Sequence, residues 1–382
     1  MSLLTTSDAV TAACERLSKE RFVCVDTEFM RERTYYPKLC LVQISGKTEA
    51  VAIDTLAKDI DLSPIFVLMA NPEILKVFHA CRQDMEIFHH LDGKLPNPIF
   101  DTQIGAMVCG HGDSVSYDKL VRKLTGSKID KSSRFTDWSR RPLSDAQIGY
   151  ALSDVTHLRE AYLKLYQELK KNGREHWLEE EFEVVTNPAT YNNDPQSAWS
   201  RLKIRGGNPR FLAMARALAA YRETEAQRRD LPRNRILRDD VLLDIAARAP
   251  KSPSELAKVR NITPQFASGP GGKEILKTVA QAIALPVSEC PVIEQDADRR
   301  QPRPAIVELL RVLLKHKAEQ YAVAQKLVAN ANDLDAIALN DGADTPALRG
   351  WRREVFGEDA LSIKSGRLAL SVSGEEIKLI RL

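Results

Sequence analysis

The stretch VDTEF (25–29) places two carboxylates at the end of an apolar, strand-like run that begins at Phe22. Side chains two positions apart lie on the same face of an extended strand, so Asp26 and Glu28 are expected to point in one direction. Carboxylates this close repel each other unless one takes up a proton or a cation joins them. Because a ligand set made only of oxygen suits hard ions such as Mg²⁺ or Mn²⁺, the stretch predicts a metal site.

Two later segments add carboxylates at similar places. In LKVFHACRQDMEIF (75–88) a short apolar strand runs into a polar turn, and Asp84 falls near the start of a helix. In YALSDVTHL (150–158), which has a helical pattern, Tyr150 and Asp154 are one turn apart on one face. Each acid alone is more often a cap or a turn residue than a ligand. Together, the four acids and the tyrosine indicate a nuclease site that binds metal.

In this order and with their flanking residues, the segments resemble the DEDD superfamily of 3′→5′ exonucleases, in the subgroup whose third motif carries tyrosine. Within that subgroup the resemblance is to the ribonuclease D family, and it covers nearly the whole chain. The segments that carry it are DTEFMRERTYYPKLCLVQIS (26–45), HACRQDMEIF (79–88), TDWSRRPLSDAQIGYALSDVTHL (136–158) and LPRNRILRDDVLLDIA (231–246). One departure lies in SSRFTDW (132–138), which has Arg134-Phe135-Thr136 where the family has a Gln-x-Ser type run.

The resemblance implies a role for each residue of the cluster. Asp26, Glu28, Asp84 and Asp154 would hold two divalent metal ions, Mg²⁺ or Mn²⁺, which activate a water and stabilise the departing 3′ oxygen of the phosphodiester. Tyr150 would orient the attacking water. A tyrosine pKa of ~10 makes it a poor general base, so positioning is the expected role.

Substrate contacts are expected from two further places. Residues after the first acid pair and before the third acid could touch the 3′ end, and a cluster of arginines could face phosphates. For Phe29, core packing is an equally good interpretation. A histidine at a strand end, such as His79, is more often structural. The predicted substrate-binding residues are Phe29, Met30, His79, Arg233, Arg235 and Arg238.

The alternation of strand-like and helical segments predicts an α/β layer fold for the first part of the chain. The resemblance implies a ribonuclease H-like fold whose first three strands form a meander, followed by one or two all-α HRDC-type domains. A polar interruption near 288–304 separates the last two parts, and RLALSVSGEEIKLIRL (367–382) could form a hairpin. The predicted parts are an exonuclease domain at 1–175, a helix end and linker at 176–198, a basic HRDC domain at 199–285, and a diverged HRDC-like domain at 300–382.

Composition bounds these expectations. The net charge is only +3, but residues 199–280 hold 17 Lys and Arg against 8 Asp and Glu, as a nucleic-acid-binding surface requires. The N-terminus has no secretory pattern and no stretch approaches the ~20 apolar residues of a membrane span, so we expect a cytoplasmic protein. The six cysteines show no metal-binding spacing and are expected to be reduced. No long heptad pattern is present, so a monomer is expected.

The leading hypothesis is a metal-dependent 3′→5′ exoribonuclease that releases nucleoside 5′-monophosphates. Its expected partner is RNA with a single-stranded 3′ end, and the resemblance points to tRNA precursors and other small structured RNAs. Two alternatives stay open: a 3′→5′ DNA exonuclease of repair, and a non-catalytic nucleic-acid-binding protein. The five residues of the cluster do not separate RNA from DNA.

Overall fold

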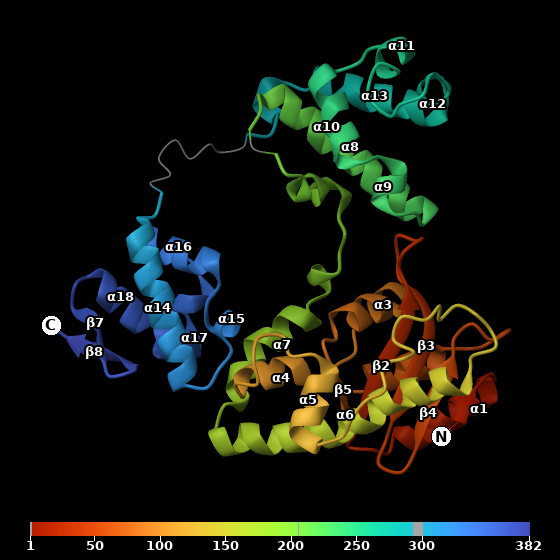
Figure 1. Ribbon diagram of the computed structural model, residues 1–382. Coiled ribbons are helices and arrows are strands. Elements are labelled where there is room, and N and C mark those ends of the chain that lie inside the picture. The colour runs from red at the N-terminus through yellow and green to blue at the C-terminus, as the bar shows by residue number, and fades with distance from the viewer. Residues whose placement is uncertain (1, 205, 293–300) are drawn as a thin grey trace. The chain divides into compact units, whose positions relative to one another are not determined.

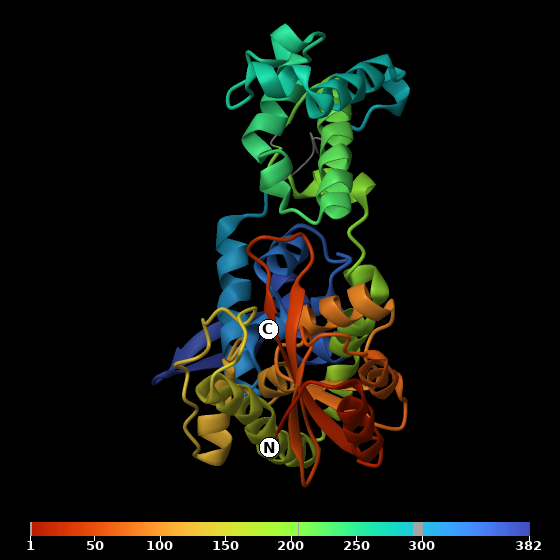
Figure 2. The same cartoon turned by 90° about the vertical axis from the view of Figure 1, so that its right-hand side faces the viewer.

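The computed structural model describes residues 2–204, 206–292 and 301–382. The chain divides into two compact units, which Figures 1 and 2 show in two orientations. The predicted boundary near 288–304 includes residues 293–300, which lie outside the described residues. Unit 1 comprises residues 1–28, 39–190 and 300–382, and unit 2 comprises residues 29–38 and 191–299.

A six-stranded mixed sheet forms the centre of the first part of unit 1, in the order β1-β4-β3-β2-β5-β6. Strand β4 pairs parallel with β1 and antiparallel with β3, while β5 pairs parallel with both β2 and β6. The three strands predicted to form a meander, β2, β3 and β4, are neighbours as expected. The bounds are β1 Ser2–Leu4, β2 Phe22–Met30, β3 Lys38–Ser45, β4 Ala50–Asp54, β5 Leu75–Phe78 and β6 Ile99–Asp101.

Strands β2, β3 and β4 follow one another directly, and helices separate the other strands, so the predicted α/β architecture is confirmed. The longest helix, α6, packs on β4 and β5 and begins with a capping box between Ser144 and Gln147. Strand β1 is not predicted, because three residues are too few to show an alternating pattern. The helices are α1 Ser7–Leu17, α2 Ser63–Ala70, α3 Arg82–Asp92, α4 Thr102–Val108, α5 Tyr117–Thr125, α6 Asp145–Asn172 and α7 Glu179–Thr186.

The C-terminal residues also belong to unit 1 and pack on its first part. The Trp177 and Trp351 rings stack with centroids 4.1 Å apart, and buried Arg352 forms ion pairs with Glu180 and Glu181. The predicted terminal hairpin is confirmed, with β7 and β8 pairing antiparallel. The elements are α14 Pro304–Gln320, α15 Gln325–Val328, α16 Ala331–Leu339, α17 Gly350–Arg352, α18 Glu358–Lys364, β7 Leu368–Ser373 and β8 Glu376–Arg381.

Unit 2 is helical, and its longest helix, α8, starts where Asn208 caps it and Pro209 occupies the first turn. Helices α10 and α13 pack on α8 around a core that includes Leu218, Leu242 and Ile275. Across the described residues, no helix is both long and apolar enough to cross a membrane. The helices are α8 Pro209–Arg229, α9 Arg233–Ile236, α10 Asp239–Arg248, α11 Pro253–Leu256, α12 Pro264–Ser268 and α13 Pro270–Ala284.

The connection between β2 and β3 belongs to unit 2 and is bonded to α8 and its C-terminus. Asp230 accepts hydrogen bonds from the backbone N–H groups of Tyr35 and Tyr36, both at 3.0 Å. The Tyr35 hydroxyl donates to Glu223, which is fully buried, and the guanidinium of Arg233 lies 4.8 Å from the Tyr35 ring centroid. These contacts give Tyr35 and Tyr36, which stand in the segment DTEFMRERTYYPKLCLVQIS (26–45), a structural role.

Candidate active site

Three elements of unit 1 bring the predicted acids together. Asp26 and Glu28 lie on β2, whose neighbours in the sheet are β3 and β5. Asp84 lies in the first turn of α3, directly after β5, and Asp154 lies on α6, which packs across β4 and β5. Because β2 and β5 are parallel and adjacent, the carboxylates at their ends meet at one edge of the sheet.

The geometry of the cluster is compact. Carboxylate oxygens of Asp26, Glu28 and Asp154 all lie within 4.8 Å of one another. Asp84 lies near this group, as the repulsion between its charge and that of Asp26 indicates. It accepts a hydrogen bond from the Thr27 hydroxyl. One ion can therefore reach three carboxylates, with a fourth beside them.

The electrostatics show that burial and mutual repulsion outweigh the one positive charge that the described residues place near these acids, that of Arg134. Burial, followed by repulsion from Asp26, Asp154 and Asp84, raises the pKa of Glu28 to about 10. Burial and the charge of Asp26 raise the pKa of Asp154 to about 8, and burial raises that of Asp26 to about 6. Burial and repulsion also raise the pKa of Asp84 well above its ordinary value. A bound cation would reverse these shifts.

The donor set fits a divalent metal ion. All four groups offer oxygen, the ligand that hard divalent ions prefer. Oδ1 of Asp154 is buried and, within the described residues, receives no hydrogen bond. Since buried carboxylate oxygens normally have a donor or a cation, this orphaned acceptor is the atom that a metal ion would satisfy.

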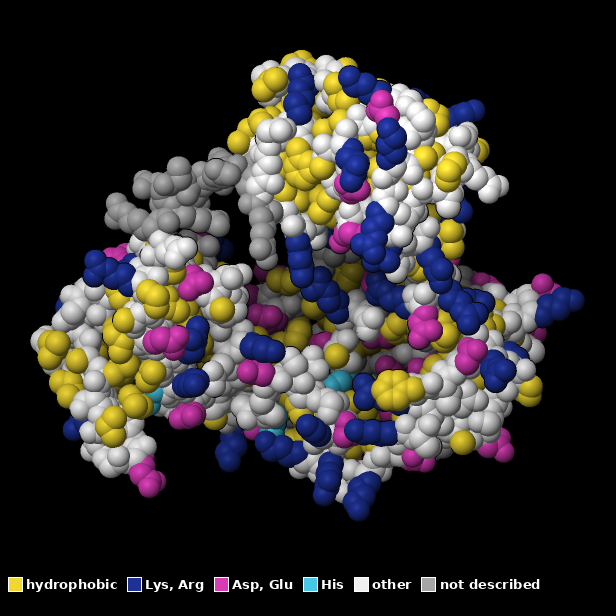
Figure 3. Space-filling model, turned by 45° about the horizontal axis from the view of Figure 1, so that its top comes forward, with side chains coloured by type: hydrophobic (Ala, Val, Ile, Leu, Met, Phe, Trp, Pro, Cys, Tyr) yellow, Lys and Arg dark blue, Asp and Glu magenta, His cyan; other side chains and the backbone are white. Residues whose placement is uncertain are grey.

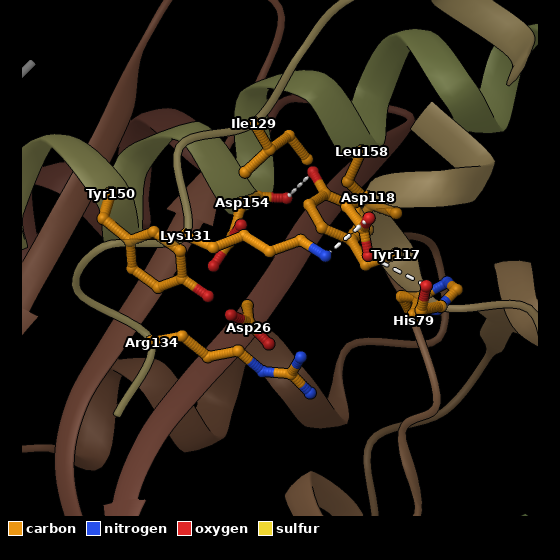
Figure 4. Close-up of a pocket in the computed structure, with 11 residues that line it drawn as sticks. Asp26, His79, Tyr117, Asp118, Ile129, Lys131, Arg134, Tyr150, Asp154 and Leu158 are labelled. Atoms are coloured by element: carbon orange, nitrogen blue, oxygen red, sulfur yellow. Dashed lines mark hydrogen bonds and ion pairs between the residues drawn. The ribbon is translucent and has the colours of Figure 1, made fainter. Parts of the chain in front are cut away.

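A pocket of about 180 Å³ adjoins the acids and is shown in Figure 4. Asp26, Tyr150 and Asp154 line it together with Arg134 and Lys131. Lys131 pairs with Asp118 at 2.6 Å, so its charge is already matched. The pocket thus gives a ligand access to the carboxylates.

Tyr150 lies on α6 one turn before Asp154, as the sequence predicts. Its ring is packed near Trp138, with centroids 6.1 Å apart, and Trp138 is buried. Burial, followed by the charges of Asp154 and Glu28, raises the pKa of Tyr150 well above its ordinary value. The phenol therefore keeps its proton and offers a hydrogen-bond donor at the site.

The predicted substrate-binding residues have different surroundings. His79 lines the pocket, its Nδ1 lies 3.0 Å from the Thr102 hydroxyl, and burial lowers its pKa, so it is neutral. Phe29 and Met30 follow Glu28 on β2 and are half-buried. Their contacts with a substrate stay predictions.

The three arginines of unit 2 differ from one another. Arg233 donates two hydrogen bonds of 2.6 Å to Glu223, so its charge is matched inside the protein. Arg235 and Arg238 are exposed, although Arg238 also pairs with Asp240 at 3.1 Å. A groove of about 590 Å³ lies beside them within unit 2, and its lining includes Arg201, Arg222, Arg233 and Arg238. Lys and Arg side chains are prominent over the helices of unit 2 in Figure 3.

Sequence reasoning missed residues that line the pocket. Tyr117, at the start of α5, donates a hydrogen bond to the backbone carbonyl of Asp154 and so supports α6 at the site. Arg134 was noticed only as a departure from the family pattern. No spacing in the sequence marks either residue, because both approach the acids from a separate segment.

Comparison with known proteins gives concordant matches. Residues 1–172 match a family model described as a 3′-5′ exonuclease, and residues 211–279 match the HRDC domain. The chain is 50% identical over 380 residues to ribonuclease D of Granulibacter bethesdensis, covering 99% of this chain and 96% of that protein. It is 49% identical to ribonuclease D of Nitrobacter hamburgensis, over 100% of this chain and 99% of that one.

A solved structure also matches nearly the whole chain. It is that of Escherichia coli RNase D, an exoribonuclease involved in structured RNA processing. The TM-score is 0.82 at 29% identity, covering 95% of this chain and 98% of that chain.

Proposed function

Because the chain belongs to the ribonuclease D family of 3′-5′ exonucleases, we propose that its acid cluster, with two bound Mg²⁺ or Mn²⁺ ions, removes nucleotides one at a time from RNA 3′ ends. The chain is a 3′-5′ exoribonuclease by its relationship over the full length to proteins of that name. The observation that carries the metal-dependent mechanism is the meeting of three carboxylates within 4.8 Å, with Oδ1 of Asp154 left without a donor.

The metal ions would supply a water of lowered pKa and would neutralise charge on the leaving 3′ oxygen. The residues that would hold them are Asp26, Glu28 and Asp154, with Asp84 beside Asp26. Thr27 fixes the orientation of Asp84 through its hydroxyl hydrogen bond. The products would be nucleoside 5′-monophosphates, because attack at phosphorus breaks the bond to the 3′ oxygen of the preceding nucleotide.

Tyr150 would hold the attacking water through a hydrogen bond and would not take its proton. The raised pKa of Tyr150, caused first by burial and then by the neighbouring carboxylates, supports this role. The tilted packing of its ring near Trp138 helps to position the phenol. Loss of the hydroxyl would then slow the reaction without removing the metal ligands.

For the substrate, we favour tRNA precursors and other small structured RNAs that end in a single-stranded 3′ tail. The pocket can take an unpaired strand, while Arg235 and Arg238 of unit 2 are exposed and could face phosphates of the same RNA. A monomer acting in the cytoplasm completes this proposal.

Product analysis tests the proposal. RNA and DNA of one sequence, labelled at the 3′ or the 5′ end, are incubated with Mg²⁺, Mn²⁺ or EDTA and with wild type or Asp26→Asn. Stepwise, metal-dependent loss from the RNA 3′ end, absent in the variant, is expected. Faster loss from DNA would move the assignment to repair. Binding without cleavage in any metal would favour a non-catalytic nucleic-acid-binding protein.

A further inference from the structure

The loop between α5 and α6 places the positively charged side chain of Arg134 in the lining of the pocket beside the acids. Arg134 lines the pocket with Asp26, Tyr150 and Asp154, and Figure 4 shows its side chain running alongside Asp26. Its charge attracts the carboxylates of Glu28 and Asp154. Within the described residues, however, its guanidinium forms no hydrogen bond and no ion pair, so its five N–H donors are available to a ligand.

The neighbouring residue is an exposed aromatic. The side chain of Phe135 is 90% exposed, and the Arg134 guanidinium lies 5.1 Å from its ring centroid. A phenylalanine this exposed adds nothing to a core, and an aromatic face beside an unpaired guanidinium offers two kinds of contact that a nucleotide can use.

The rest of the loop is fixed, which gives these two side chains a defined place. On one side of them, the Thr136 hydroxyl accepts a hydrogen bond of 3.1 Å from Gln147 on α6, and buried Trp138 packs near Tyr150. On the other side, Lys131 pairs with Asp118 on α5. The contacts on both sides lie within three or four residues of Arg134 and Phe135. They hold the backbone of these two residues in place while the two side chains are exposed.

We propose that Arg134 and Phe135 hold the 3′-terminal nucleotides of the RNA strand, with Arg134 donating to phosphate oxygens and Phe135 stacking on a base. This assignment rests on the proposed function and adds a substrate-contacting pair to it. Guanidinium is suited to phosphate because its planar donors match two oxygens at once.

Binding to a single-stranded RNA tests the pair, measured in an Asp26→Asn background so that no cleavage occurs. We expect Arg134→Gln and Phe135→Ala each to weaken binding about tenfold. Arg134→Gln is also expected to reduce the slope of log affinity against log salt by about 0.7, the loss of one phosphate contact on a single strand. Phe135→Ala should leave that slope unchanged, and Arg134→Lys should restore it. Arg140→Gln, an exposed arginine of the same loop outside the pocket lining, is the matched control and should bind as the parent does.

Kinetics in the otherwise wild-type chain separate a substrate contact from a purely electrostatic role among the acids. A substrate contact predicts a higher KM for RNA at saturating Mg²⁺. An unchanged KM and salt slope, with only the Mg²⁺ dependence altered, would overturn the proposal. If Asp26→Asn abolished cleavage while Arg134→Gln changed nothing, this inference alone would fail; if Asp26→Asn cleaved as wild type does, the proposed function would fail first.

Discussion

Glu28, which is half-buried, and Glu223, which is fully buried, are glutamates that the two units surround in opposite ways. Glu223 is fully buried, yet it receives two hydrogen bonds of 2.6 Å from Arg233, one from Tyr35 and an ion pair with Arg201 at 3.3 Å. Although burial acts to raise the pKa of Glu223, the hydrogen bonds from Arg233 and Tyr35 outweigh it and hold the pKa below its ordinary value.

Glu28 has the reverse surroundings. Its neighbours are Asp26, Asp154 and Asp84, and burial together with their repulsion raises its pKa to about 10. The comparison teaches how to distinguish a structural acid from a functional one. At Glu223 arginines of the chain hydrogen-bond the carboxylate, whereas among the residues that the structure describes Glu28 has only the charge of Arg134, without a hydrogen bond, against the charges of three carboxylates. Such a cluster could hold a metal ion.

The largest expected difference between the two sites is in catalysis. Asp154→Asn removes a metal ligand and should lower kcat/KM on single-stranded RNA by about 10³-fold or more. The folded Glu223→Gln protein should keep activity within about threefold, because Glu223 is bonded to Arg233 and lies outside the acid cluster. Single-turnover cleavage at saturating Mg²⁺ measures both. A strongly active Asp154→Asn enzyme would break the distinction.

In stability the order reverses. Glu223→Ala leaves Arg233 beside an emptied buried site and should lower the free energy of unfolding by about 3 kcal/mol, the lower end for breaking a buried pair because Arg233 is partly exposed. Urea unfolding followed by circular dichroism gives the value. Glu225→Ala on the same helix, which removes an ion pair with the exposed Arg228, is the control and should cost about 0.5 kcal/mol. Equal losses would contradict a special role for Glu223.

Mg²⁺ should raise the free energy of unfolding by binding at the acid cluster around Glu28 and not at Glu223. At a Mg²⁺ concentration of about 100 times Kd, linkage predicts a gain of about 2.7 kcal/mol in wild type. Asp26→Asn should lose most of this gain, and Glu223→Gln should keep it. Thermal unfolding with and without Mg²⁺ reads the effect, and a gain that survives in Asp26→Asn would place the ion elsewhere.

The two acids also predict opposite pH trends. In the metal-free protein, Asp154 and Glu28 hold protons up to about pH 8 and 10, whereas in the unfolded chain they ionise near 4. The folded state then binds more protons, so this contribution is fully present below about pH 4 and should be lost progressively as pH rises from there towards 10. The lowered pKa of Glu223 acts the other way, with stability present above its unfolded value and lost as pH falls.

Unfolding in EDTA across this pH range tests the trend. Glu28→Gln should flatten the loss at high pH, while Glu223→Gln should not. A metal-free wild type whose stability did not fall with rising pH would show that ionising the acid cluster does not destabilise the folded state.

The smallest expected effect comes from one hydroxyl. Tyr35→Phe removes the hydrogen bond to Glu223 but leaves Arg233 in place, so the free energy of unfolding should fall by about 1 kcal/mol. A Tyr35→Phe protein as stable as wild type would indicate that the arginines alone lower the pKa of Glu223.

The local sequence predicted on which kind of element each residue of the candidate site lies. Asp26 and Glu28 lie on a strand, Asp84 lies in the first turn of a helix, and Tyr150 and Asp154 lie one turn apart on another. These predictions succeeded because alternation along a strand and the 3.6-residue repeat of a helix depend only on near neighbours. The predicted domain boundaries and the substrate contacts of Phe29, Met30 and the arginines stay predictions.

Contacts between distant segments were beyond the sequence. Tyr35 and Glu223 are 188 residues apart, and nothing local tells that the tyrosine donates to the acid or that Arg233, expected on an RNA surface, is paired inside the protein. Arg134 likewise reaches the acids from a loop that no periodic pattern describes.

The sequence by itself determined the local settings of four acids and a tyrosine, and these settings predict an oxygen-ligand metal site. Only the tertiary structure decided which buried acids receive internal cations and which are left to recruit them. The physical reason is that a carboxyl's pKa depends on burial and on charges a few ångströms away in space, whatever their separation along the chain.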